Sequence, residues 1–298
     1  MLALIAGEGR LPAAVAAAQA RRPLVCALRG HAPEGLAPDM TFRVEQLGGL
    51  MATLKAQGVT RVCLCGGVRR PEIDLGALDD ATLPLVPRLR DALRLGDDGA
   101  LRALIAILEG EGFEVVAAHE AAPALLPPAG VPTAARPGPG AEAEARLGAE
   151  VVAEMGAADQ GQACAIRGER VLAREGPEGT DAMLARLAPP QAPGPQGGAG
   201  DPFSWAADMM GDVLGGAADW LSGQGGDEGA RAGLLYKAPK PDQDRRADLP
   251  AIGPRTAAAV AAAGLAGIVI EVGGVMVLDR DATVAALDRA GLFLWVRG

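Results

Sequence analysis

Short apolar runs alternate with amphipathic segments along the first 120 residues of the chain. The apolar runs, most of which end in glycine, predict strands at 2–7, 23–30, 59–67 and 113–120. Helical spacing of the apolar residues predicts helices at 11–20, 42–58 and 97–112. Strands that are continuously apolar and alternate with helices are typical of a parallel sheet with both faces covered. The pattern therefore predicts an α/β fold for this part of the chain.

A proline-rich break at 122–140 divides the chain. We expect an N-terminal domain at 1–125, a linker at 126–140 and a C-terminal domain at 141–298. In the C-terminal part the pattern predicts helices at 143–156 and 179–188, strands within 162–175, and a strand–helix series at 255–296. At 298 residues, the chain is long enough for two α/β domains that each bury a core.

A second low-complexity break opens an inserted segment at about 189–231, which we expect to be flexible. Within it, residues 203–221 have the spacing of an amphipathic helix whose narrow polar sector is acidic. One interpretation is an additional helix that packs on the core, and another is a lid or a membrane-surface helix. Interfacial helices usually carry Lys or Arg on the polar face, so the acidic sector weakens the membrane interpretation.

Composition narrows the classes of function. The 28 basic and 37 acidic residues give a net charge of −9, which argues against a general nucleic-acid-binding protein. A local pocket of opposite sign can still bind an anionic small molecule. The chain starts without a signal peptide, and its longest apolar run, at 257–270, is shorter than the roughly 20 residues of a membrane span. We therefore expect a cytoplasmic protein that does not span a membrane.

Cysteine and histidine limit the chemistry further. Cys63 and Cys65 are separated by one residue, whereas structural zinc sites space a pair by about two to four residues. We expect all four cysteines to be reduced and to pack as small apolar side chains. His31 and His119, the latter at the end of a predicted strand, are the only histidines, so a Ser-His-Asp triad or a multi-histidine dinuclear metal centre has almost nothing to build from.

Glycines after the first predicted strand are candidate ligands for a phosphate. Gly7 and Gly9 stand where the backbone can approach a phosphate at a helix start, although a plain tight turn would use them equally. The third glycine of a dinucleotide fingerprint is missing, and no acidic residue closes the second strand at the expected distance. Both absences disfavour an NAD(P)-dependent reductase.

Acidic residues at two predicted helix starts have two interpretations. Asp97 and Asp98 open one helix, and Thr180 and Asp181, in the stretch EGTD, open another. A carboxylate at such a position caps the first amides of the helix and suits its dipole. A second carboxylate beside the cap leaves one side chain for a substrate.

The loop at 237–253, KAPKPDQDRRADLPAIG, combines several cations and carboxylates with three prolines, which rule out a long regular helix. Its cations Lys237, Lys240, Arg245 and Arg246 could neutralise a phosphate or a pyrophosphate. Its aspartates, Asp242, Asp244 and Asp248, could hold a divalent cation through oxygen ligands. Phosphoryl transfer asks for both kinds of group, because its catalysis is mostly positioning and charge neutralisation. A solvated surface loop is the alternative.

Together these motifs resemble the bacterial UDP-2,3-diacylglucosamine pyrophosphatases of the non-calcineurin, LpxI-type family of lipid A biosynthesis. The matches keep the family's order and spacing over most of the chain: LIAGEGRLP, VRRP, GDDGALRALIAILEGEGFEVVAAHE, DQGQ, EGTDAML, KAPKPDQDRRADLPAIG, AGLAGIVIE and AGLF. The loop at 237–253 is the most specific of them. The calcineurin-like enzymes of the same step would need histidine clusters, which this chain lacks.

The resemblance implies cleavage of the pyrophosphate of UDP-2,3-diacylglucosamine by water and a divalent metal, commonly Mg²⁺. The products would be 2,3-diacylglucosamine 1-phosphate (lipid X) and UMP, with water attacking the phosphorus on the sugar side. It implies a Rossmann-like N-terminal domain, a C-terminal α/β domain of different topology, and a ligand between them. It also implies a homodimer, for which the sequence has no signal of its own, and transient contact with the cytoplasmic face of the inner membrane.

The resemblance makes Asp248, in the element DLP-x-IG, the essential aspartate, as a metal ligand or as the residue that orients the attacking water. Residue chemistry adds the expected substrate-binding residues. Lys237 and Lys240 would neutralise the pyrophosphate. The others are expected to line the sugar-phosphate pocket or to approach the nucleotide: Gly7, Gly9, Asp97, Asp98, Gln162, Thr180 and Asp181.

Two departures from the family pattern stand out. Gly67 occupies a position that can be Asn in relatives, and the segment at 189–231 is an insertion relative to shorter members. We hypothesise that the inserted helix shields acyl chains or helps the enzyme meet its substrate at the membrane. The alternative function is a nucleotide-sugar-binding or regulatory module without catalysis, which would be expected to lack the acidic residue found at Asp248.

Overall fold

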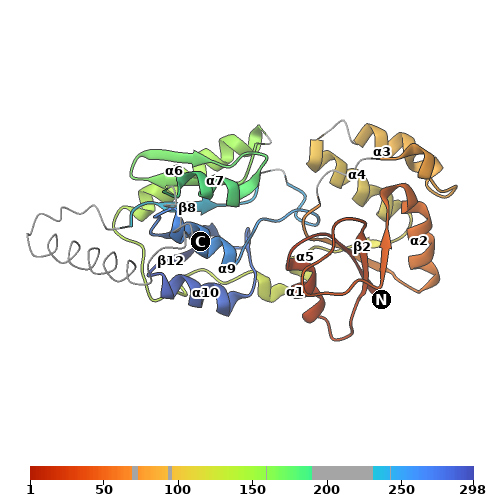
Figure 1. The fold of residues 1–298 in the computed structure, drawn as a ribbon, viewed down its shortest axis with the longest axis horizontal. Coiled ribbons are helices and arrows are strands. Elements are labelled where there is room, and N and C mark those ends of the chain that lie inside the picture. The colour runs from red at the N-terminus through yellow and green to blue at the C-terminus, as the bar shows by residue number, and fades with distance from the viewer. Residues whose placement is uncertain (69–72, 93–95, 159, 190–230, 242) are drawn as a thin grey trace, which may run out of the picture.

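The computed structural model describes residues 1–68, 73–92, 96–158, 160–189, 231–241 and 243–298, and Figure 1 shows two α/β halves that lie side by side. The inserted segment predicted at 189–231, with its amphipathic helix at 203–221, lies almost entirely outside the described residues.

The N-terminal half contains, within the described residues, a five-stranded parallel sheet of order β3-β2-β1-β4-β5. Its strands are β1 (Leu2–Ala6), β2 (Leu24–Leu28), β3 (Met40–Phe42), β4 (Arg61–Cys65) and β5 (Glu114–Val115). The chain runs outward from β1 to β3 and then returns to β4, so the strand order reverses between β1 and β4. The predicted parallel sheet is confirmed. In such sheets, ligands bind outside the carboxyl ends of the strands at the reversal.

Helices cover both faces of this sheet, because successive strand residues point to opposite sides. On one face, α2 (Leu47–Ala56) and α4 (Gly96–Gly110) share a core with Ala3 and Val62. On the other, α1 (Leu11–Ala17) and α5 (Ala118–Ala121) share a core with Leu4 and Cys63. The other helical segments are α3 (Val86–Ala92) and short 3₁₀ turns at Val44–Gln46, Leu75–Ala77, Leu83–Leu85 and Pro123–Leu125.

The strand predicted at 113–120 is wrong over its second half. β5 ends at Val115, and His119 lies in α5 rather than at the end of a strand. The carboxylate of Glu120 accepts a hydrogen bond of 2.9 Å from the amide of Ala117, and this bond closes the first turn of the helix. β3 and α3 are short elements that the pattern did not predict.

The C-terminal half contains a mixed five-stranded sheet of order β12-β10-β8-β6-β7 in the part of the chain that is described. Its strands are β6 (Ala163–Arg167), β7 (Arg170–Arg174), β8 (Leu234–Lys237), β10 (Gly267–Glu271) and β12 (Phe293–Arg297). β8, β10 and β12 are parallel, while β6 runs antiparallel to both β7 and β8. The expected C-terminal α/β fold with a different topology is therefore confirmed.

The central strand β8 separates two cores. Leu234 and Tyr236 face α6 (Ala141–Ala157), whereas Leu235 faces α7 (Gly179–Leu187), α9 (Pro254–Ala262) and α10 (Arg280–Arg289). By the same alternation, Lys237 follows Leu235 to the side of α7 and α9. Lys237, at the carboxyl end of β8, therefore lies near the starts of α7 and α9.

Two short segments connect the halves. β9 (Ala251–Ile252) and β11 (Met276–Val277) form a parallel pair, and Met276 packs in a core cluster of the N-terminal half. The segment predicted as a linker, 126–140, is tied to the C-terminal half from Gly130 onward, where Gly130 and Val296 exchange backbone hydrogen bonds of 2.8 and 2.9 Å.

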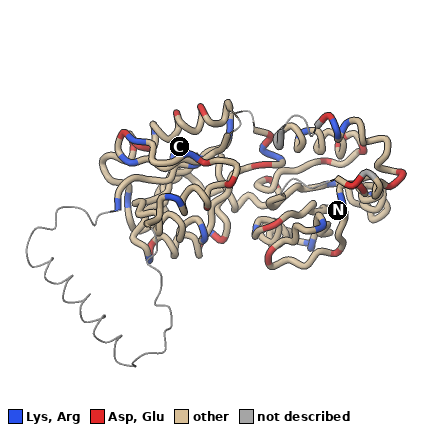
Figure 2. The backbone as a smooth tube through the Cα atoms, turned by 45° about the horizontal axis from the view of Figure 1, so that its top comes forward, with Lys and Arg blue, Asp and Glu red and all other residues tan. Residues whose placement is uncertain are grey.

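Figure 2 shows basic and acidic residues interspersed along both halves. Of the helices that the structure describes, none combines the length and the apolar composition that a membrane span requires.

Gly148 in α6 tests the close packing of this helix on β8. The Cβ of an alanine there would lie 2.6 Å from the Cβ of Tyr236. We expect Gly148→Ala to lower the free energy of unfolding by about 1–3 kcal/mol, because an overpacked core must move. Thermal unfolding followed by circular dichroism measures the change. Gly110→Ala, whose Cβ would meet open space, is the matched control, and equal melting of the two variants would contradict the packing.

Candidate active site

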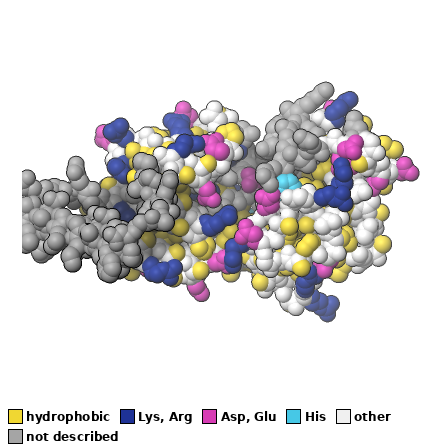
Figure 3. All heavy atoms as spheres, in the orientation of Figure 1, with side chains coloured by type: hydrophobic (Ala, Val, Ile, Leu, Met, Phe, Trp, Pro, Cys, Tyr) yellow, Lys and Arg dark blue, Asp and Glu magenta, His cyan; other side chains and the backbone are white. Residues whose placement is uncertain are grey.

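A cavity of about 560 Å³ lies between the two halves at the carboxyl edge of the N-terminal sheet. From the N-terminal half it is lined by the loops after β1, β2 and β4. From the C-terminal half it is lined by the starts of α7 and α9, the loop at 245–253 and the segment around β11. On the face seen in Figure 3, basic and acidic side chains lie along the boundary between the halves. The cavity is therefore a polar site that needs both halves.

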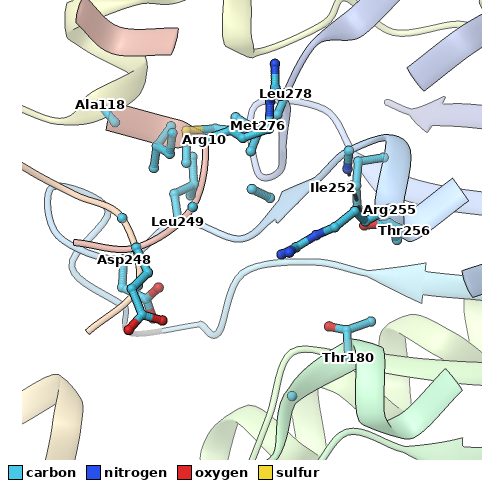
Figure 4. Close-up of a pocket in the computed structure, with 18 of the residues that line it drawn as sticks. Arg10, Ala118, Thr180, Asp248, Leu249, Ile252, Arg255, Thr256, Met276 and Leu278 are labelled. Carbon is cyan, nitrogen blue, oxygen red and sulfur yellow. Dashed lines mark hydrogen bonds between the residues drawn. The ribbon is translucent and has the colours of Figure 1, made fainter. Parts of the chain in front are cut away.

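The polar loop at 237–253 is held on the N-terminal half by apolar contacts. Ala247 packs against the core of α2 and α4, and Leu249 is buried in the core of α1 and α5. Asp248 lies between them and lines the cavity, as Figure 4 shows. The amides of Ala247 and Asp248 both donate to the carbonyl of Asp244, which closes the turn.

Charged residues of the same loop have a structural role. The Asp244 carboxylate accepts from Arg246 Nη2 at 2.7 Å and from Nε at 3.0 Å, and the Arg246 guanidinium holds the pKa of Asp244 below its usual value. Arg246 Nη1 also donates to Glu109 of α4 at 2.5 Å. Asp244 and Arg246 therefore tie the loop to the N-terminal half. Gln243 donates its side-chain amide to Asp248, which orients that carboxylate at the cavity.

Lys237 is a buried ammonium at the edge of the cavity. The residue is 7% exposed, and its Nζ donates to Thr180 Oγ1 at 2.9 Å. Burial lowers the pKa of Lys237, and the nearby carboxylates of Glu175, Asp181 and Asp248 oppose that shift. No carboxylate among the described residues forms an ion pair with it. A buried cation that is compensated only at a distance is suited to an anionic ligand.

Three ion pairs cross between the halves around the cavity. Arg10 Nε meets Asp279 at 2.6 Å, Arg255 meets Glu34 at 3.8 Å, and Arg246 meets Glu109 at 2.5 Å. Figure 4 shows the Arg255 side chain extending into the cavity. Sequence reasoning did not single out Arg10 and Arg255. Each follows a glycine that comes after a strand, but only the fold shows that both residues line one cavity.

A second cavity, of about 440 Å³, adjoins the first and is mostly apolar. It lies inside the N-terminal half and reaches α4 through Leu101 and Leu104. The two cavities share lining residues from the end of β4 and the loop after it, and from the polar loop at 237–253: Leu64, Gly66, Gly67, Ala247 and Asp248. Asp248 thus lies where a charged chamber meets an apolar one.

The structure brings together some of the predicted site residues. Those that line the polar cavity are Gly9, Thr180, Asp181, Lys237 and Asp248. Lys240 and Gln162 are not among the lining residues of either cavity. The side-chain oxygen of Gln162 is buried and accepts no hydrogen bond from the described residues, while the backbone N–H of Gln162 donates to Glu175 Oε2 at 2.8 Å.

Other predicted residues have local explanations. Gly7 packs against the loop after β4, where a Cβ would lie 2.4 Å from the carbonyl oxygen of Gly67. Gly9 has a φ of +86° and open space around it, so its turn needs glycine for conformation. Asp97 and Asp98 stand in the first turn of α4, and their side chains lie outside the described structure.

The histidines and cysteines are placed away from a shared centre. His31 is buried, and its Nδ1 lies 3.0 Å from Glu8 Oε1 on the loop after β1. The four cysteines are buried and form no disulfide, as predicted. Burial raises the pKa of Cys26 and Cys164 to about 12, so their thiols stay protonated.

The carboxylates of the cavity are compatible with a magnesium ion that also binds substrate. Within the described residues, no group of three or more His, Cys, Asp or Glu side chains is clustered for a metal. Mg²⁺ commonly uses one or two protein carboxylates together with substrate phosphates and water. The Asp248 carboxylate lines the cavity and has the chemistry of such a ligand. The described residues therefore fit this mode of binding and do not form a cage of protein ligands alone.

This geometry defines a class of protein: two α/β domains that enclose a cavity lined by both basic and acidic residues, next to an apolar cavity. Comparison with known proteins agrees. Residues 1–125 match the LpxI N-terminal domain, and residues 128–295 match the LpxI C-terminal domain. The UDP-2,3-diacylglucosamine pyrophosphatase LpxI of Caulobacter vibrioides is 37% identical over 298 aligned residues, which cover 98% of this chain and 96% of the relative. The chain belongs to the LpxI family, and the resemblance inferred from the sequence is confirmed.

Leu249 tests the anchoring of the loop. We expect Leu249→Ala to destabilise the docked loop by about 2–4 kcal/mol, since the leucine is buried and its loss leaves a cavity. Hydrogen exchange of the amides of Ala247 and Asp248 should then become faster by a factor of about 30 or more, as the lost free energy implies. Val171→Ala, at an exposed position of β7, serves as control. Unchanged exchange in Leu249→Ala would contradict the anchoring.

Proposed function

We propose that this protein hydrolyses the pyrophosphate of UDP-2,3-diacylglucosamine to 2,3-diacylglucosamine 1-phosphate (lipid X) and UMP, a step of lipid A biosynthesis. The name of its Caulobacter relative supports this substrate. The observation that carries the proposal is the meeting of a charged cavity and an apolar cavity at Asp248.

The substrate has the same division as the site. Its pyrophosphate is anionic and its acyl chains are apolar, and the two are joined through one sugar. The charged cavity offers Lys237, Arg10 and Arg255 to the pyrophosphate. The apolar cavity offers a chamber in which an acyl chain gains about 25 cal/mol for each Å² removed from water. A sugar located at the junction would bring its phosphate close to Asp248.

Asp248 has two candidate roles in the reaction. As a carboxylate oriented by Gln243, it can accept a hydrogen bond from the attacking water and align it with the phosphorus. As an oxygen ligand, it can also hold a divalent cation. Following the family resemblance, we propose attack on the phosphorus on the sugar side, which leaves UMP as the departing group.

Lys237 would bind the pyrophosphate at the opposite wall. The ammonium is fixed by its 2.9 Å hydrogen bond to Thr180, so little side-chain entropy is lost when an anion binds. Its burial strengthens the attraction to phosphate oxygens relative to a lysine in water.

Magnesium is part of the proposal. Asp248 and the substrate phosphates would hold it, and the ion supplies positive charge against the charge that builds up on the phosphate oxygens. We also propose that the enzyme acts in the cytoplasm with transient contact at the inner membrane, because its substrate carries acyl chains. The homodimer that the resemblance implies stays a prediction.

The direct test is hydrolysis of UDP-2,3-diacylglucosamine by the purified protein in H₂¹⁸O with Mg²⁺. We expect lipid X and UMP as products, with ¹⁸O in lipid X, and we expect EDTA to stop turnover until Mg²⁺ is restored. Label in UMP would move the attack to the other phosphorus. Substrate binding without turnover by folded protein would favour a nucleotide-sugar-binding module instead.

Replacement of Asp248 tests its role. We expect Asp248→Asn to lower kcat by roughly 10²–10⁴-fold, the usual worth of a positioned acid–base group, while the protein melts as the wild type does. The change keeps the size of the side chain and removes its charge. Asp80→Asn, at an exposed position outside both cavities, is the matched control. Wild-type kcat in the Asp248 variant would exclude this assignment.

A further inference from the structure

Glu175 lies behind the two predicted pyrophosphate-binding residues and has its own place in the cavity lining. Its Oε1 accepts from Thr180 Oγ1 at 2.5 Å, and its Oε2 accepts from the backbone N–H of Gln162 at 2.8 Å. Thr180 Oγ1 in turn accepts from Lys237 Nζ at 2.9 Å. The three side chains therefore form a directed chain from Lys237 through Thr180 to Glu175.

The direction of this chain follows from the number of protons. A threonine hydroxyl has one proton, and Thr180 gives it to Glu175. Thr180 then has no proton for a phosphate and acts on Lys237 as an acceptor. An ammonium has three N–H groups, and Thr180 is the hydrogen-bond partner of Lys237 within the described residues. The remaining N–H groups are available to an anion in the cavity.

Three carboxylates from different elements lie near this ammonium. Glu175 follows β7, Asp181 is in the first turn of α7, and Asp248 is in the loop at 237–253. Glu178, Arg245 and Arg255 also line the cavity. Burial lowers the pKa of Lys237, and among the carboxylates that oppose this shift Glu175 has the largest effect. The carboxylate behind Thr180 thus favours the charged form of the lysine.

We propose that Glu175 is a positioning residue that acts through Thr180 to hold Lys237 as an ammonium directed at the bound pyrophosphate. This rests on the proposed function, in which the cavity takes a pyrophosphate. It assigns Thr180 to the lysine instead of to the substrate.

Inorganic pyrophosphate is the probe, and calorimetric titration of the full chain between pH 7 and 9.5 measures its binding. Glu175→Gln keeps the size of the side chain and removes its charge. We expect about tenfold weaker binding at pH 8.5, and we expect binding to be lost at lower pH than in the wild type. The sign follows because binding needs the ammonium, and without Glu175 the lysine loses its proton at lower pH. The same ligand is used throughout, so its own titration cancels.

Thr180 gives an independent arm in case Glu175→Gln does not fold. Thr180→Ser keeps the hydroxyl and should bind pyrophosphate as the wild type does, whereas Thr180→Val should behave like Glu175→Gln. Glu169→Gln, at an exposed position of the β6–β7 turn, is the control. A merely structural role would not move the pH at which binding is lost.

Wild-type affinity and an unchanged pH dependence in both Glu175→Gln and Thr180→Val would overturn the proposal, as would a wild-type protein that does not bind pyrophosphate. Failure of the proposed function would be seen separately. If the wild-type protein binds pyrophosphate but leaves UDP-2,3-diacylglucosamine intact, the proposed function is wrong, while the inference about Glu175 still stands.

Discussion

The packing of Leu249, which is buried, and of Ala247, which is partly buried, against the N-terminal half is the contact on which the site depends. Both residues belong to a loop of the C-terminal half, and each packs into a different core of the N-terminal sheet. Burying a leucine contributes about 1.5–3 kcal/mol, whereas an exposed ion pair contributes about 0–1 kcal/mol. The pairs Arg10–Asp279 and Arg255–Glu34 are largely exposed. Apolar anchoring therefore holds Asp248 at the junction, and the ion pairs add little to it.

The electrostatics of the site depend on where individual charges lie, and not on an excess of one sign. The chain carries a net charge of −9, and its cavity is lined by both carboxylates and cations, among which Lys237 is the buried one. Burial lowers the pKa of Lys237, and the carboxylates near it oppose this shift although none of those described forms an ion pair with it. In the proposed function, the carboxylates favour the ammonium form and the ammonium itself binds the anion.

The fold was predictable where the pattern was long and regular. The parallel sheet and the main helices of the N-terminal half follow from alternating apolar runs and amphipathic segments. The central strand β8 could not be predicted from the pattern, because LLYK is only four residues long and ends in a lysine, which suggests a surface position. The extent of β5 was overestimated, because the apolar run continues into α5, where a cap from Glu120 begins a helix.

The site was predictable in part for a related reason. Asp248, Lys237, Thr180 and Asp181 stand in motifs, and the structure places them around one cavity. Glu175, Arg10 and Arg255 became visible only when the two halves were seen together, since their partners lie far away in the sequence or across the boundary. The apolar cavity is lined mostly by residue types that any hydrophobic core contains, so no sequence motif could predict it.

The central claim is that Asp248 lies where the charged and the apolar cavity meet and that one substrate occupies both. A crystal structure of the Asp248→Asn variant with UDP-2,3-diacylglucosamine tests this most directly. The account predicts the pyrophosphate beside Lys237, the sugar at position 248, and an acyl chain between Leu101 and Leu104 in the apolar cavity. A substrate whose acyl chains lie outside that cavity, with its pyrophosphate away from Lys237, would contradict it.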